Sequence, residues 1–167
     1  GGGRFENRGG NGAVLSSAQA ADPQRRTARK EFKPMIRLRP HHALCLQTYV
    51  GKGYSNAFSE NMTKISQALN QRPTQMVHFT LGADEICAAC PNLQNGVCSK
   101  EDSCAELDRL AWEAMALGCG EVLSWEEATQ LVRQNLLETG KYHALCDGCT
   151  WEELCTVQRK GLTNLEK

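Results

Sequence analysis

The stretch IRLRPHHALC, residues 36–45, combines the start of a folded domain with candidate metal ligands. Its first four residues alternate apolar and basic side chains, which is typical of a half-buried β-strand. Pro40 then favours the first position of a helix, where its missing N–H group has no hydrogen bond to lose. On that helix Cys45 follows His41 by four residues and His42 by three, so the three side chains would share one face. The stretch therefore predicts a strand that leads directly into a ligand-bearing helix.

The rest of the chain predicts more helices than strands. The first helix is expected to end near Val50, and residues 77–81 alternate in the manner of a second strand. Another helix shows an apolar stripe at helical spacing, formed by Phe58, Met62, Ile65 and Leu69. Capping boxes predict three further helix starts, at Ser103-x-x-Glu106, Ser124-x-x-Glu127 and Thr150-x-x-Glu153. The predicted fold class is α+β, a mostly helical small domain with a small β-sheet and cysteine-rich metal-binding loops.

Charge and composition divide the chain at about residue 34. Residues 1–34 are rich in glycine and carry seven Lys/Arg against three Asp/Glu, whereas residues 35–167 carry twelve against sixteen. Because the first part shows no hydrophobic period, we expect a disordered Gly/Arg-rich extension there. Residues 35–167 are expected to form a single cysteine-rich metal-binding domain. With only 6% aromatic residues, nucleic acid is not an expected partner beyond weak phosphate contacts of the basic tail.

The cysteines indicate a reducing compartment. All nine lie in residues 35–167, and an odd number without a secretory signal argues against a disulfide framework. No apolar run approaches the roughly 18 residues of a membrane span. We therefore expect a cytoplasmic protein that does not enter a membrane and whose clustered cysteines serve metal or redox chemistry.

Two groups of cysteines share one format, a C-x2-C pair followed at short range by a third cysteine. A two-residue gap lets both sulfurs turn towards one centre while the intervening backbone amides stabilise the thiolates. One such pair is a weak signal, but two pairs with a third cysteine each predict thiolate–metal ligation. The six predicted ligands are Cys87, Cys90 and Cys98 in the first group and Cys146, Cys149 and Cys155 in the second.

Three further side chains are candidate ligands. Cys45, His41 and His42 have helical spacing, although a buried cysteine and two histidines at a helix start explain that pattern equally well. Cys104 is in step with apolar residues of its helix and is expected to pack in the core, whereas Cys119 is expected to be a loop thiol. Because one tetrahedral or cubane centre takes four ligands, the set allows one centre with spare thiols or two with mixed ligation.

The two cysteine groups are expected to converge on one iron–sulfur cluster, of the 4Fe–4S type, in preference to zinc. A third cysteine beside each pair exceeds what a four-ligand zinc ribbon needs. The Cys90-Pro91 step is similar to the Cys-Pro of bacterial ferredoxin motifs, although the other gaps differ from ferredoxin spacing. The predicted function is electron transfer or redox sensing, with a redox protein as partner. The alternatives are a zinc-stabilised structural or interaction domain and a metal-dependent enzyme that uses the His41-His42 pair. The oligomeric state stays open.

Several blocks of the chain resemble the domain-of-unknown-function 1284 family, a small bacterial and archaeal family. The blocks are residues 36–46, 49–55, 84–87, 124–125 and 146–151, the last reading CDGCTW. The resemblance runs from Met35 to Cys155 and implies an iron–sulfur-binding protein. It also implies family counterparts for Cys45 and for all six cysteines of the two groups, but none for Cys104 and Cys119.

Overall fold

The structure is a computed structural model that describes residues 34–118 and 120–163. The chain divides into two units, Gly1–Phe32 and Lys33–Lys167. The predicted disordered extension lies outside the described residues except for Pro34, and so does Cys119, the predicted loop thiol. The fold is therefore that of the second unit.

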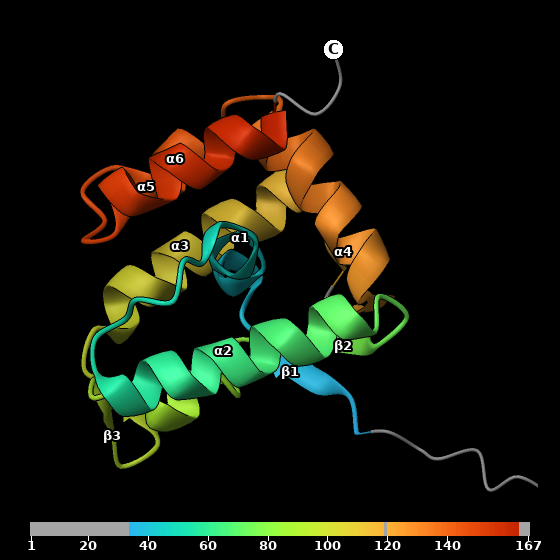
Figure 1. Cartoon of the computed structure of the whole chain (residues 1–167). Helices are drawn as coiled ribbons and strands as arrows, with labels where there is room; N and C mark the ends of the chain where they lie inside the picture. Colours follow the sequence, from blue (N-terminus) through green and yellow to red (C-terminus); the bar gives the residue numbers. More distant parts are fainter. Residues whose placement is uncertain (1–33, 119, 164–167) are drawn as a thin grey trace, which may run out of the picture. The chain divides into compact units, whose positions relative to one another are not determined.

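The second unit is mostly helical and contains a small sheet (Figure 1), which confirms the predicted α+β class. Its strands are β1 (Ile36–Leu38), β2 (Met76–Phe79), β3 (Leu93–Gln94), β4 (Val97–Cys98) and β5 (Val122–Ser124). Its helices are α1 (Pro40–Thr48), α2 (Asn56–Gln71), α3 (Glu101–Met115), α4 (Trp125–Val132), α5 (Tyr142–Cys146) and α6 (Glu152–Thr163), with a 3-10 turn η1 (Cys87–Ala89) and a π-helical turn η2 (Arg133–Leu137). In the part of the chain that the structure describes, none of the helices combines the length and the apolar character that crossing a bilayer requires.

Three strands form a sheet in the order β1-β2-β5. β1 runs parallel to β2, with Ile36 opposite Val77, and β5 runs antiparallel to β2. Because neighbouring parallel strands need a long crossover connection, the segment that contains α1 and α2 separates β1 from β2 in the chain. Val77 and Phe79 are fully buried, so the central strand β2 anchors the sheet in the core.

The cysteine-rich segment after η1 forms a hairpin of β3 and β4. Its two-residue loop, Asn95-Gly96, has positive φ angles of 50° and 79°, as a type I′ turn requires. The pairing sets Cys98 opposite Leu93, and the Leu93 amide donates to the Cys90 carbonyl at 3.0 Å. The hairpin therefore folds Cys98 back towards the C-x2-C pair that precedes it.

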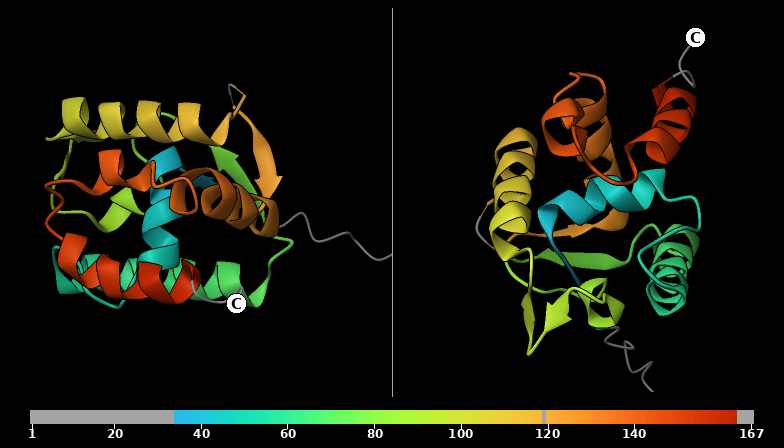
Figure 2. Two further views of the ribbon diagram at one scale, coloured as in Figure 1. Left: turned by 90° about the horizontal axis from the view of Figure 1, so that it is seen from above. Right: turned by 90° about the vertical axis from the view of Figure 1, so that its left-hand side faces the viewer.

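Helix α1 passes through the centre of the second unit, with α3 on one side and α2 and α6 on the other (Figure 2). It packs against α3, α4 and α6. Its apolar residues Ala43, Leu44 and Leu46 are buried, as expected for a helix that other elements surround. The central position lets α1 present side chains both to α3 and to the C-terminal helices.

The capping-box prediction is confirmed at Ser124 and wrong at Ser103. Ser124 Oγ accepts a hydrogen bond from the Glu127 amide at 3.2 Å, and the Glu127 carboxylate accepts one from the Ser124 amide at 2.8 Å. Helix α3, in contrast, already begins at Glu101. Acidic residues in that first turn complement the positive end of the helix dipole, so the helix extends beyond the predicted cap.

Candidate metal centre

One cavity brings the predicted site residues together. Its volume is about 180 Å³, far more than the ~10–15 Å³ that a single water molecule needs. The unexpected Cys104 lines it as well. All nine predicted site residues line the cavity: His41, His42, Cys45, Cys87, Cys90, Cys98, Cys146, Cys149 and Cys155. Eight cysteines from distant parts of the chain therefore line one space.

The first thiol set consists of Cys45, Cys146, Cys149 and Cys155. Cys45 lies on α1, which packs against α6, the helix that carries Cys155. Cys146 ends α5, and Cys149 lies in the turn between α5 and α6. Burial raises the pKa of the Cys45 thiol far above its ordinary value, and the three neighbouring thiols of the set raise it further. Cys45 thus completes a group of four with the C-terminal triad.

The turn between α5 and α6 has the compact geometry of a C-x2-C pair. The Cys149 amide donates to the Cys146 carbonyl at 2.9 Å. Gly148 adopts a φ of 73°, in the left-handed region where any side chain is strained. Burial raises the pKa of Cys146 to about 11, and the guanidinium of Arg159 opposes that rise. Arg159 is itself buried and lies 4.7 Å from the centre of the Tyr142 ring, so a fixed positive charge accompanies the first thiol set.

The second thiol set consists of Cys87, Cys90, Cys98 and Cys104. The Sγ atoms of Cys98 and Cys104 lie 4.0 Å apart, and the Lys100 amide donates to Cys98 Sγ at 3.4 Å. The prediction that Cys104 packs in the core is wrong, because the first turn of α3 follows directly on β4 and holds this half-buried thiol beside Cys98. Across η1, the Cys90 amide donates to the Cys87 carbonyl at 2.9 Å.

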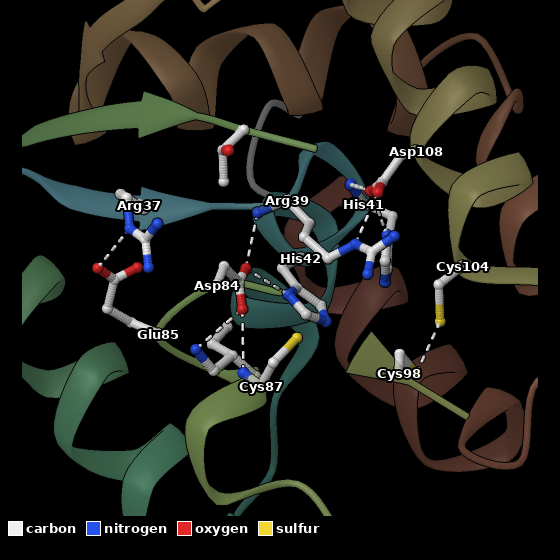
Figure 3. A network of polar contacts seen from close by, with 12 residues as sticks. Arg37, Arg39, His41, His42, Asp84, Glu85, Cys87, Cys98, Cys104 and Asp108 are labelled. Atoms are coloured by element: carbon white, nitrogen blue, oxygen red, sulfur yellow. Dashed lines mark hydrogen bonds and ion pairs between the residues drawn. The ribbon is translucent and has the colours of Figure 1, made fainter. Parts of the chain in front are cut away.

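A buried ionic network adjoins the thiols (Figure 3). Arg39 Nε donates to Asp108 Oδ2 at 2.6 Å, and its terminal nitrogens donate to the Glu101 carboxylate at 2.8 and 3.0 Å. Burial alone would lower the pKa of Arg39, but the two carboxylates outweigh this effect and raise it. Arg39 is therefore buried despite its charge, and its ion pairs join β1 and α1 to α3.

Both histidines of α1 are oriented by carboxylates. His41 Nδ1 lies 2.5 Å from Asp108 Oδ1, and His42 Nδ1 lies 2.7 Å from Asp84 Oδ2. The two imidazoles lie side by side, with ring centres 4.3 Å apart. A carboxylate on one ring nitrogen fixes the tautomer and leaves the other nitrogen to bind a metal or a proton. The histidine pair is thus oriented as ligands and acid–base groups commonly are.

Asp84 positions its neighbours rather than offering a free metal ligand. His42, Asp84 and Cys87 bring three ligand atoms within 4.8 Å of one another. However, Asp84 Oδ2 also accepts the Arg39 amide at 2.7 Å, and Oδ1 accepts the amides of Ile86 and Cys87 at 2.9 and 3.0 Å. Four hydrogen bonds use the acceptor sites of a carboxylate. Although burial would raise the pKa of Asp84, the contacts with His42 and the backbone lower it well below its ordinary value.

The charge state of His41 follows from its surroundings. Burial lowers its pKa from 6.5 to about 4, and the neighbouring His42 contributes to the decrease, which outweighs the opposing effect of Asp108. The imidazole is therefore neutral at neutral pH. With the Nδ1 hydrogen directed to Asp108, Nε2 keeps the lone pair that a metal ion or a proton would take.

Several residues of the candidate site were not predicted from the sequence. Asp84 and Asp108 are fully buried acids, and only the position of Asp108 on an otherwise apolar helix face could have revealed one of them. Cys104 had a clearer signal, because the Cys98-x5-Cys104 spacing repeats the Cys149-x5-Cys155 spacing. With this x5 spacing, Cys104 belongs with Cys87, Cys90 and Cys98, and Cys45 joins the C-terminal triad. Eight of the nine cysteines then form two sets of four.

Comparison with known proteins gives one match. The sequence model of a family described as "Protein of unknown function (DUF1284)" matches residues 53–155. The chain therefore belongs to the domain-of-unknown-function 1284 family, as its resemblance predicted. The matched region contains both C-x2-C pairs, whereas the stretch 36–45 with Cys45 and the histidine pair precedes it. No curated protein and no solved structure matches the chain.

Proposed function

We propose that the protein binds an iron–sulfur cluster of the 4Fe–4S type and uses it in electron transfer or redox sensing. The four thiolates of the first thiol set would hold the cluster. The observation that carries the proposal is the position of Cys45, because it brings a fourth thiol from α1 to the triad of α5 and α6. Four cysteines are the usual protein ligands of such a cluster.

The spacing of the thiols supports a cluster over a single zinc ion. Zinc–sulfur bonds of about 2.3 Å in a tetrahedron place the sulfurs about 3.8 Å apart. Among the described residues, the only group with three ligand atoms within 4.8 Å of one another is His42, Asp84 and Cys87. The first thiol set is therefore more widely spaced than a zinc tetrathiolate. A core of iron and sulfide, which separates its cysteine ligands, fits this spacing better.

The surroundings of the first thiol set suit redox chemistry. When bound, the cluster would supply one-electron transfer. Arg159 would offset part of the negative charge of the four thiolates, and burial of Cys45 would keep water away from one side of the site. Cys149 is exposed, which provides a short path between the site and a redox partner at the surface. These features adjust the reduction potential through charge and solvent access.

A metal-dependent enzyme remains the second candidate because of the two histidine–carboxylate pairs. Their orientation by Asp84 and Asp108 is typical of ligands and of acid–base residues. Replacing both His41 and His42 with alanine separates the two functions. If the variant keeps its metal but loses a redox or hydrolytic activity of the wild type, the enzyme is favoured. If metal binding and activity are unchanged, the histidines have no catalytic role.

Elemental analysis of the full chain, purified without oxygen, tests the proposal. We expect a brown protein with iron and acid-labile sulfide in equal amounts, about four of each per chain. A colourless protein that contains zinc and no labile sulfide would contradict the proposal and favour the zinc-stabilised structural domain, which should unfold when a chelator removes the metal.

A further inference from the structure

The second thiol set lies in the same cavity but is not needed for the cluster. If the first set supplies four ligands, Cys87, Cys90, Cys98 and Cys104 are left as a complete group of four thiols on η1, β4 and α3. We propose that these four cysteines bind a second metal ion, a single divalent cation of the zinc type. This inference goes beyond the proposed cluster and concerns a different set of ligands.

The distance between Cys98 and Cys104 supports a single ion. Their Sγ atoms lie 4.0 Å apart, close to the edge of about 3.8 Å that a tetrahedral zinc tetrathiolate has. Both thiols line the cavity and are half-buried. The pair is thus already spaced to bind one ion between its sulfurs. Cys87 and Cys90 would have to move towards this pair to complete a tetrahedral site, since among the described residues only His42, Asp84 and Cys87 bring three ligand atoms within 4.8 Å of one another.

The local fold gives these thiols the support that thiolate ligands need. The Lys100 amide donates to Cys98 Sγ at 3.4 Å, and amide-to-sulfur hydrogen bonds stabilise thiolates in metal sites. Cys104 lies in the first turn of α3, where the helix dipole also favours negative charge.

The hairpin connects this pair to the C-x2-C turn. The Leu93 amide bonds to the Cys90 carbonyl, and Leu93 is paired with Cys98. Cys98 is therefore held near the turn that carries Cys87 and Cys90. The result is the pattern C-x2-C followed by C-x5-C, that is, two pairs of cysteines brought together by a short hairpin, which is how many structural zinc sites are built.

Binding requires only an exchange of protons for metal. Each of the four thiols loses its proton to solvent and forms one sulfur–metal bond, and no electron is transferred. The bound ion would join η1, β4 and the start of α3, so we expect it to stabilise this part of the fold.

Metal analysis of matched variants tests the inference on the full chain. Zinc is added to protein prepared without oxygen, excess metal is removed, and zinc, iron and labile sulfide are measured. We expect about one zinc ion per wild-type chain. The double variant Cys98→Ser/Cys104→Ser should lose this zinc and keep its iron and sulfide. Cys119→Ser, the control that removes a cysteine outside both sets, should keep all three.

The possible outcomes separate this inference from the proposed function. Loss of zinc in the double variant supports the second site, whether or not the wild type contains iron. A wild type without iron would contradict only the proposed cluster. Zinc retained at the wild-type level, or iron in place of zinc at the second set, overturns the inference. If the double variant does not fold, alkylation of the wild type shows whether the second thiol set binds zinc. Zinc should protect Cys87, Cys90, Cys98 and Cys104 from iodoacetamide, and equal labelling with and without zinc would contradict the site.

Discussion

The Nε atom of Arg39 donates to the Asp108 carboxylate at 2.6 Å, and both side chains are almost completely buried. The pair joins the junction of β1 and α1 to α3, two segments that are 69 residues apart in the chain. The same carboxylate orients His41, so the ion pair supports both the fold and the wall of the cavity.

Removal of Asp108 should strongly destabilise the protein. Asp108→Ala leaves the buried Arg39 without one of its two carboxylates, and breaking a buried pair in this way typically costs about 3–5 kcal/mol. Urea unfolding, followed by circular dichroism, measures the change. Glu106→Gln, which breaks an exposed ion pair with Arg109 on the same helix, is the control and should leave the unfolding midpoint nearly unchanged. Equally small effects of both substitutions would show that the buried pair does not stabilise the fold.

Stability should decrease in mild acid because of His41. Its pKa is about 4 in the folded protein and 6.5 when exposed, so the unfolded chain binds an additional proton between these values. The free energy of unfolding should therefore fall by about 3 kcal/mol as the pH decreases from 6.5 to 4.

Unfolding experiments on His41→Asn and the wild type, carried out between pH 6.5 and 4, isolate the contribution of His41 to the pH dependence of stability. The asparagine amide can still donate to Asp108 but does not titrate, so the variant should lose much of the pH dependence. His143→Asn, which replaces an exposed histidine of α5, should behave as the wild type does. A pH dependence that is unchanged in His41→Asn would contradict the neutral, buried imidazole.

Cys45 should be required for the cluster although it is distant in sequence from the C-terminal triad. Cys45→Ser removes one of four proposed ligands, and we expect retained iron and sulfide to fall by more than half after desalting without oxygen. Cys104→Ser, in the second thiol set, is the matched control and should keep both. If Cys104→Ser loses the iron and Cys45→Ser does not, the assignment of the two sets is wrong.

The turn between Cys146 and Cys149 should not tolerate a side chain at Gly148. Its φ of 73° is left-handed, and a side chain there costs about 1–2 kcal/mol. Gly148→Ala should therefore weaken metal retention in competition with a chelator. Gly161→Ala is the control, since a Cβ at that position of α6 meets no atom within 4 Å, and it should raise helix stability by about 0.5–1 kcal/mol. Equal metal retention in both variants would contradict the proposed role of the turn.

The sequence predicted those parts of the site that depend on local spacing. The C-x2-C pairs and the helical interval from His41 to Cys45 bring ligand atoms together within one turn, whatever the rest of the fold does. Pro40 likewise marked the start of α1, and the Ser124 capping box marked the start of α4, because both signals act on the adjacent backbone.

The contacts that the sequence did not predict are those made by tertiary packing. Arg39 is one of the basic residues of the alternating stretch 36–39, and nothing in that stretch indicated that α3 would supply Asp108 and Glu101 as its partners. Cys104 was expected in the core because it is in step with apolar residues of its helix, but the start of α3 just after β4 holds it beside Cys98. The burial of Arg39 therefore has no local cause that one segment of sequence could reveal, whereas the contact between Cys98 and Cys104 joins residues only six apart in the chain.

X-ray absorption at the iron and zinc edges, on the full chain prepared without oxygen, distinguishes a bound cluster from a single metal ion. We expect iron surrounded by sulfur, with a second shell of nearby iron atoms, as in a cluster held by the first thiol set. A protein without iron that holds zinc in all-sulfur surroundings would contradict the proposed cluster. Iron without neighbouring iron atoms would contradict it as well.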